Sequence, residues 1–410
     1  GRLQTLLTRN LPLTQTTFPA THNSFNSTAY PGLSSTGDPN HTLTLAQQLS
    51  LGMEGLELDL HWIPHLLTGN FAPVACHGLG ASMAHFGCTP QDRHLREVLT
   101  EIAAALQLPE NKGRVILLDL EDSLADFRPP NSAEPSLAAH DQAAALFEQI
   151  LGPLIYKPVQ PEVSIPEGCT TLGISTLSKQ DVLDAGKQII LVSGCGVGAQ
   201  WKKWVFQFDR KQKANDGFDA NTCESDFFKP EDFRSRFTRL WHDSTQLGAF
   251  TNSSLKAITA QDVRAMNLCG LHQASIDRLT LGDERLAANI WSWETGFPQK
   301  AATRQCVYQG ENGRWKTGDC QARRAYACFI PGGEGWRIVP GQDRFKGEWQ
   351  AGRSACKQEG GTFGLPKSAR QNAQLNEVLK KSSLKEVWLN WADGGSNGLS
   401  GAGVFALPVR

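Results

Sequence analysis

The chain has 410 residues and a formal charge of −1, and 40% of its residues are hydrophobic. This length favours one domain of about 250 to 300 residues together with a smaller one. Acidic and basic residues are mixed along the chain, so no basic stripe indicates a nucleic-acid partner and no acidic tail indicates disorder. No apolar run approaches the roughly 20 residues of a transmembrane helix, and we expect a soluble protein.

Strand-like and helix-like patterns alternate through the first 300 residues. Residues 55–62 alternate leucines with Glu57, Asp59 and His61, which is the period-two pattern of a strand. Residues 114–122 form an apolar run that turns acidic at its end, as a buried parallel strand would. The spacing of apolar residues predicts further helices over 92–108, 138–152, 178–186 and 259–267, and further strands over 187–194, 237–244, 269–276 and 287–293.

About eight strands with intervening helices predict an α/β fold, a β/α barrel of the TIM type. An open doubly wound sheet is the alternative, but the first unit lacks the Gly-rich turn between strand and helix. The composition changes after Trp293. We therefore predict a barrel domain over residues 1–300 and a small, mostly β, disulfide-braced module over residues 301–410.

The cysteines indicate the compartment. Ten cysteines with no CxxC spacing are typical of disulfides in an exported protein, and a chain that begins at Gly1 fits a processed one. Three N-x-S/T triplets, at Asn26, Asn40 and Asn252, permit glycosylation. We expect a secreted, extracellular protein. Cys76 and Cys88 either bridge each other locally or each pair elsewhere.

The strand ends carry the candidate catalytic residues, because barrel enzymes place their catalytic groups at the C-terminal ends of the strands. Glu57 and Asp59 stand two apart on one strand and share a face. With Asn23 and Glu121 they form an all-oxygen set that suits a hard divalent cation, calcium before magnesium. Two histidines at strand ends can serve as acid, base and oxyanion stabiliser. These histidines are His22 and His77.

The segments THN (21–23), GLELD (55–59), CHG (76–78) and LDLED (118–122) resemble the landmarks of the X-region barrel of phosphatidylinositol-specific phospholipases C. The match covers residues 10–125 well. It implies a peripheral enzyme that cleaves inositol phospholipids at a membrane surface to diacylglycerol and a cyclic inositol phosphate, by attack of the inositol 2-hydroxyl.

The resemblance also implies a role for each residue. His22 would stabilise the transition state, and His77 would protonate the leaving diacylglycerol oxygen. Glu57 or Asp59 would take the proton of the attacking hydroxyl. Metal-independent bacterial members carry an arginine at the position of Asp59, so the aspartate implies calcium dependence. The calcium ligands would be Asn23, Glu57, Asp59 and Glu121.

Three later segments allow more than one interpretation. In residues 239–245, Trp241, His242 and Asp243 either contact the headgroup or pack at a strand end. Residues 200–206 are either a contact with a membrane interface or an amphipathic loop. Residues 304–329 resemble the closing half of a C-type lectin-like domain, and residues 354–375 and 387–395 resemble its opening half, so the halves stand in reverse order. The calcium–sugar motifs of such lectins are absent there, so glycan contact by this module is a weak expectation.

Two other functions compete with a phospholipase C. Sphingomyelinase D and glycerophosphodiester phosphodiesterases use a similar barrel with His, E-x-D and His. The asparagine after His22 and the LDLED strand favour the phospholipase. The third possibility is a lipid- or glycan-binding protein that has lost its chemistry, against which the complete residue set argues.

Overall fold

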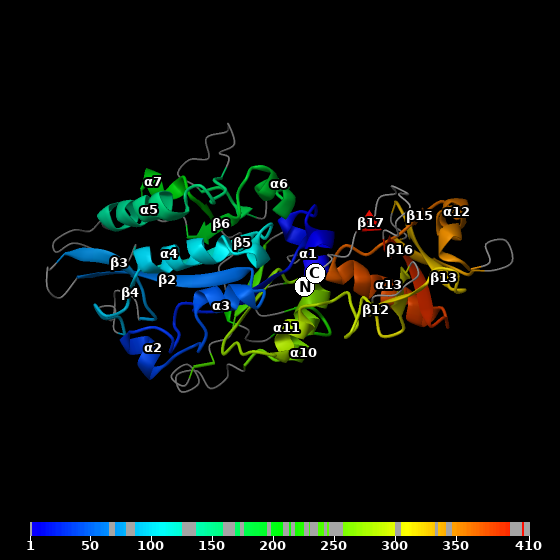
Figure 1. Ribbon diagram of the computed structural model, residues 1–410, viewed down its shortest axis with the longest axis horizontal. Helices are drawn as coiled ribbons and strands as arrows, with labels where there is room; N and C mark the ends of the chain where they lie inside the picture. The colour runs from blue at the N-terminus through cyan, green and yellow to red at the C-terminus, as the bar shows by residue number, and fades with distance from the viewer. Residues whose placement is uncertain are drawn as a thin grey trace. The chain divides into compact units, whose positions relative to one another are not determined.

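A computed structural model gives the fold of two compact units, Gly1–Asn289 and Ile290–Arg410 (Figure 1). The structure describes residues 2–64, 70–78, 87–124, 137–158, 169–172, 176–194, 198–207, 213–214, 218–224, 229, 237–241, 244–245, 257–299, 305–332, 335–341, 347–393 and 404–405. Within this part of the chain, no helix is both long and apolar enough to cross a bilayer.

The first unit is built around a curved sheet of eight parallel strands. They are β1 (Phe18–Thr21), β2 (Gly55–Pro64), β5 (Ile116–Asp122), β6 (Ile189–Ser193), β7 (Val205–Gln207), β8 (Lys213–Ala214), β9 (Arg239–Trp241) and β10 (Gln273–Ile276). Neighbouring strands pair in chain order from β1 to β7 and from β8 to β10, and β10 pairs with β1, which joins the last strand to the first. Among the described residues no ladder joins β7 to β8. The predicted TIM-type barrel is confirmed, with a seam at this position.

Helices cover the outside of the barrel. They are α1 (Arg2–Thr8), α2 (Leu33–Gly37), α3 (Leu45–Ser50), α4 (Leu95–Leu106), α5 (Leu137–Leu151), α6 (Lys179–Asp184), α7 (Ala199–Lys202), α10 (Ala260–Cys269) and α11 (Glu284–Ala288). Figure 1 shows α3, α4 and α5 beside β2 and β5. Leu56, Leu58 and Leu60 of β2 belong to the same buried apolar cluster as the inner residues of these helices. The alternating leucines therefore point outward, and Glu57 and Asp59 point into the barrel.

The interior face of β5 changes from apolar to polar along the strand. Leu117 of β5 lies in a fully buried apolar cluster with Phe18, Ile190 and Val192. Asp119 and Glu121 follow on the same face of β5, nearer its C-terminal end. Along β5 the interior is thus apolar at the start of the strand and acidic at its C-terminal end, the end where parallel-strand enzymes act.

A hairpin extends β2 beyond the barrel. Its last residues pair with β3 (Phe71–Ala75), which pairs with β4 (Arg93–His94). Cys76 and Cys88 form a disulfide with each other, so the local bridge is confirmed and neither cysteine pairs elsewhere. A second disulfide of this unit joins Cys223 to Cys269. His77 directly follows the bridged Cys76.

Two segments differ from the prediction. Residues 287–293 are no barrel strand, because α11 covers Ala287 and Ala288 and the unit ends at Asn289. Residues 200–206 are not a loop: they form most of α7 and most of β7. Trp201 and Trp204 are 0% and 4% exposed, and Trp201 packs on Phe147. Trp201 and Trp204 belong to the hydrophobic core of this unit, and the fifth barrel strand, β7, begins directly after Trp204.

The second unit is a mixed sheet in the order β12–β11–β16–β13–β14, with short strands β15 and β17 beside it. Disulfides join Cys306 to Cys320 and Cys328 to Cys356. A mostly β, disulfide-braced C-terminal module is therefore confirmed. Its elements are β11 (Gln305–Gly310), β12 (Trp315–Asp319), β13 (Ala325–Ile330), β14 (Gly335–Val339), α12 (Gly352–Gln358), β15 (Thr362–Phe363), α13 (Ala369–Lys381), β16 (Glu386–Asp393) and β17 (Val404–Phe405).

Candidate active site

Strand register brings the acidic residues together. In the parallel pair of β2 and β5, Glu57 stands opposite Asp119 and Asp59 stands opposite Glu121. One carboxylate oxygen from each of Glu57, Asp59 and Glu121 lies within 4.8 Å of the others. Glu57 and Asp59 are buried, whereas Glu121 is exposed. This places a cluster of carboxylates at the mouth of the barrel with one side open.

His22 is held by an aspartate from the last strand. β1 and β10 pair up to Thr21 and Ile276, so the next residues, His22 and Asp277, are neighbours. His22 Nδ1 lies 3.1 Å from Asp277 Oδ1, and its Nε2 lies 3.6 Å from Glu57 Oε2. Burial alone would lower the pKa of His22, but the charges of Glu57 and Asp277 outweigh it and raise that pKa to about 9. His22 is therefore an imidazolium at neutral pH.

A cation that the sequence analysis missed lies inside the barrel. Arg239 of β9 is 1% exposed and contacts two carboxylates, Glu57 Oε2 and Asp119 Oδ2, at 2.6 Å each. Its Nε also donates to Ser275 Oγ at 3.0 Å. Burial raises the pKa of Glu57, but Arg239 and His22 outweigh that effect and lower it, so Glu57 is a carboxylate held in place.

Asp59 has the opposite electrostatic environment. Burial and the neighbouring charges of Glu121 and Glu57 raise the pKa of Asp59 well above its usual range. A buried carboxyl of this kind needs either a proton or a cation. The Asn23 side chain also faces it. With its nitrogen toward Asp59, the amide donates to both carboxylate oxygens, at 2.9 and 3.1 Å; the opposite orientation directs its oxygen at them.

The orientation with the Asn23 side-chain oxygen toward Asp59 is the one that suits a bound cation. It gathers oxygens from Asn23, Asp59 and Glu121 at one place, the donor set that hard divalent cations prefer. Glu57 completes the cluster geometrically, but its charge is already matched by Arg239. The three carboxyl groups and the one amide expected at this site do lie close together. Arg239, from a strand far along the sequence, adds a cation to this site that was not expected.

His77 is connected to His22 through buried amides. The Asn26 side-chain nitrogen lies 3.4 Å from His77 Nδ1 and donates to Asn40 Oδ1 at 2.6 Å. Asn40 in turn donates to Asp277 Oδ1 at 2.9 Å. Asn26 and Asn40 are 1% and 0% exposed, so neither is a glycosylation site in the folded protein. The side chains of Asn26 and Asn40 are instead part of the hydrogen-bond network inside the site. Asn252 lies outside the described residues.

Comparison with known proteins places this site in a family. A family model described as "Rv2075c PI-PLC-like domain" matches residues 1–283. The uncharacterized protein Rv2075c of Mycobacterium tuberculosis is 33% identical over 394 residues, which cover 92% of this chain and 76% of that protein. The chain belongs to the Rv2075c PI-PLC-like domain family.

Several solved structures are similar to this chain at lower identity. The phosphatidylinositol-specific phospholipase C of Listeria monocytogenes is 16% identical, with a TM-score of 0.41, over 69% of this chain and 94% of that one. A calcium-dependent phosphoinositol-specific phospholipase C from Pseudomonas sp is 14% identical, with a TM-score of 0.38, over 68% and 93%. A variant of the Staphylococcus aureus enzyme is 12% identical, with a TM-score of 0.44, over 70% and 96%.

In this member of the Rv2075c PI-PLC-like domain family, every expected site residue lies among the described residues at the mouth of the barrel. Asp277 could have been found by applying the strand-end rule to the last strand as well. No local pattern could have identified Arg239, since arginine in a strand is usually a surface residue. Trp241 is half-buried and lies with its ring 6.1 Å from that of His22, so it borders the site. His242 and Asp243 lie outside the described residues.

Proposed function

We propose that this protein is a calcium-dependent phosphodiesterase of the phospholipase C type that cleaves inositol phospholipids. The observation that supports it most is the His22–Asp277 pair beside the cluster of Glu57, Asp59 and Glu121. A phosphodiester needs positive charge at its developing phosphoryl oxygens and a proton for its leaving oxygen. Imidazolium, guanidinium and a second histidine at one barrel mouth can meet these needs.

Each residue then has a defined task. His22, charged and held by Asp277, donates from Nε2 to a phosphoryl oxygen. His77 protonates the diacylglycerol oxygen as the bond from phosphorus to that oxygen breaks. Asp59 takes the proton of the inositol 2-hydroxyl as that oxygen forms the new bond to phosphorus. We assign this task to Asp59 rather than to Glu57, because Arg239 and His22 hold Glu57 as a weak base.

Calcium fits the residues present and would be held by Asn23, Asp59 and Glu121, with Glu57 beside them. When bound, it lowers the pKa of the attacking hydroxyl and neutralises charge on the phosphoryl oxygens. Magnesium is less suited, because it demands a stricter octahedral set. The open side of the cluster at Glu121 leaves room for substrate oxygens.

The test is phosphorus NMR of the purified protein with phosphatidylinositol vesicles, first with calcium and then with excess chelator. A cyclic inositol phosphate signal that requires calcium is the expected result. Turnover that survives chelation would remove the metal from the proposal. Release from sphingomyelin or glycerophosphodiesters instead would make the protein a different phosphodiesterase, and no turnover on any of these would favour a binding protein.

We also propose an extracellular location, supported by four described disulfides and by the absence of a free cysteine among the described residues. A glycan contact through residues 301–410 stays a prediction, for which neither the described geometry nor the comparisons provide support.

A further inference from the structure

The total formal charge of −1 is the sum of opposite net charges on the two units. Residues 290–410 contain 17 Lys and Arg against 10 Asp and Glu, which gives a formal charge of +7. Residues 1–289 contain 23 against 31, which gives −8. Basic segments of this kind bind polyanions, whereas an acidic unit is repelled by them. The C-terminal unit is therefore the part of the chain suited to an anionic partner.

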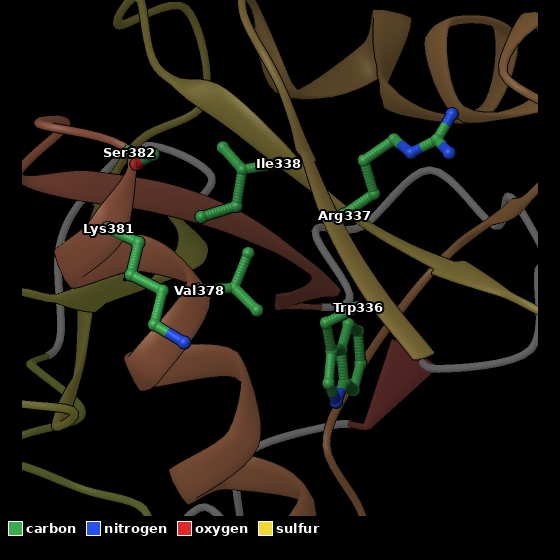
Figure 2. A pocket seen from close by; sticks show the side chains of 6 residues that line it. All are labelled: Trp336, Arg337, Ile338, Val378, Lys381 and Ser382. Atoms are coloured by element: carbon green, nitrogen blue, oxygen red, sulfur yellow. The ribbon is translucent and has the colours of Figure 1, made fainter. Parts of the chain in front are cut away.

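This unit also has an open pocket of about 310 Å³ between strand β14 and the end of helix α13. Strand β14 is the edge of its sheet in the described residues. Figure 2 shows Val378 between Trp336 and Lys381 in this view. The last turn of α13 carries Lys380 and Lys381, both exposed. The remaining lining residues are Arg337, Ile338 and Ser382.

The pocket combines three kinds of contact. Ile338 and Val378 supply an apolar wall, and Lys381 supplies an ammonium group. The Trp336 side chain is 7% exposed, and its buried Nε1 has no hydrogen-bond acceptor among the described residues. Because this nitrogen is buried, a ligand at the surface does not reach it, and Trp336 lines the pocket with apolar ring atoms. Tryptophan is also the side chain most often found where apolar and aqueous phases meet.

We propose that this face, made by Lys380, Lys381 and the pocket at Trp336, docks the protein on a bilayer that contains anionic phospholipid. A headgroup phosphate pairs with the Lys381 ammonium group, and the acyl–headgroup boundary contacts Val378. This inference rests on the proposed function, which requires a lipid surface. Charge complementarity favours this occupant, because residues 290–410 carry a formal charge of +7.

The experiment is vesicle sedimentation with the full chain. It compares pure phosphatidylcholine with an equal mixture of phosphatidylcholine and phosphatidylglycerol; neither lipid carries inositol, so the candidate active site has no substrate. We expect binding to the anionic vesicles only, and weaker binding as salt rises. The double variant Lys380→Ala/Lys381→Ala should bind about 20-fold more weakly, since each lysine near an anionic surface contributes about fivefold.

Two further variants separate specific docking from net charge. Lys112→Ala/Lys203→Ala removes the same charge from exposed positions of the barrel unit and should leave binding unchanged. Trp336→Phe keeps an aromatic wall and, because Trp336 Nε1 is buried, should also leave binding unchanged.

Several results would overturn the docking proposal. They are equal binding to both kinds of vesicle, equal losses in the two double variants, or binding to duplex DNA or an anionic polysaccharide without binding to anionic vesicles. Turnover of a soluble, short-chain phosphatidylinositol is measured alongside. If the chain binds anionic vesicles but cleaves no inositol lipid, the proposed function is wrong and the docking proposal stands. If it cleaves the soluble lipid but binds no vesicle, the docking proposal is wrong and the proposed function stands.

Discussion

His22 and Asp277, separated by 255 positions in the chain, lie with Nδ1 and Oδ1 3.1 Å apart. The pair exists because the first and last strands of the barrel are hydrogen-bonded neighbours, and each residue directly follows its strand. Asp277 also accepts hydrogen bonds from the Asn40 side chain and from the backbone N–H of Ser244. These bonds hold its carboxylate in place independently of His22. An imidazole held in this way keeps one ring nitrogen directed at the substrate.

Asp277→Asn should lower turnover by about 10²-fold, in the range typical of a positioned acid–base group, with little change in KM. Loss of the carboxylate charge removes one cause of the raised pKa of His22, so that pKa should fall below about 9. An NMR titration of the imidazole measures this shift. Asp184→Asn, at an exposed position, is the control. An unchanged His22 titration in Asp277→Asn would contradict the assignment.

Arg239→Met should destabilise the protein by about 3–5 kcal/mol, because it leaves Glu57 and Asp119 buried without their cation. Arg239→Lys should be less harmful, although one ammonium group cannot replace all three contacts. Urea denaturation measures both. The matched control is Arg337→Met, whose partner Glu359 lies 3.3 Å away at the surface, and which should cost less than about 1 kcal/mol. Similar losses for Met at 239 and 337 would contradict a structural role of the buried cation.

The stability of the protein should fall as the pH drops from 6.5 to 4, because of His272. Its Nδ1 accepts from the Thr238 backbone N–H at 2.9 Å and its Nε2 donates to the Thr14 carbonyl at 2.6 Å. Only the neutral ring can make both bonds. Burial lowers the pKa of His272 from 6.5 to about 4, and the bond to Thr14 only partly opposes this.

The unfolded chain therefore takes up a proton at His272 in this window while the folded chain does not. The free energy of unfolding should decrease by about 3 kcal/mol across the window and show no further loss from this residue below pH 4. Chemical denaturation of the wild type and of His272→Gln, over a pH series, isolates this contribution as a difference. Parallel pH profiles for the two proteins would show that His272 does not carry the effect.

The disulfide between Cys76 and Cys88 should matter for both stability and turnover. It closes a separation of 12 residues next to His77, so its removal in Cys76→Ser/Cys88→Ser should cost about 3 kcal/mol in the chain-entropy model. It should also lower turnover of a soluble substrate, since the loop that carries His77 loses its brace. Cys306→Ser/Cys320→Ser removes a bridge of similar span, 14 residues, from the other unit and should leave that turnover intact. Equal turnover in both double variants would separate the bridge from the candidate site.

The sequence alone determined the barrel class, most strand positions and the expected set of His22, Asn23, Glu57, Asp59, His77 and Glu121. The reason is local: period-two alternation fixes the face of each side chain, and parallel strands bring their C-terminal ends to one mouth. The mistaken strand at 287–293 shows the limit of this logic. Its first two residues end helix α11, and Trp293 pairs with Trp315 of the second unit instead of with a barrel strand.

Only the tertiary structure decided how the charges are divided. Arg239 comes from the seventh strand of the barrel, and it matches Glu57 and Asp119 while Asp59 is left among like charges. Asn26 and Asn40, which look like glycosylation triplets, are buried between the two histidines. Such partners are chosen by distance in space and by burial, and neither is encoded in the residues adjacent to them in the chain. The electrostatic character of the site therefore depends on contacts that no local pattern can reveal.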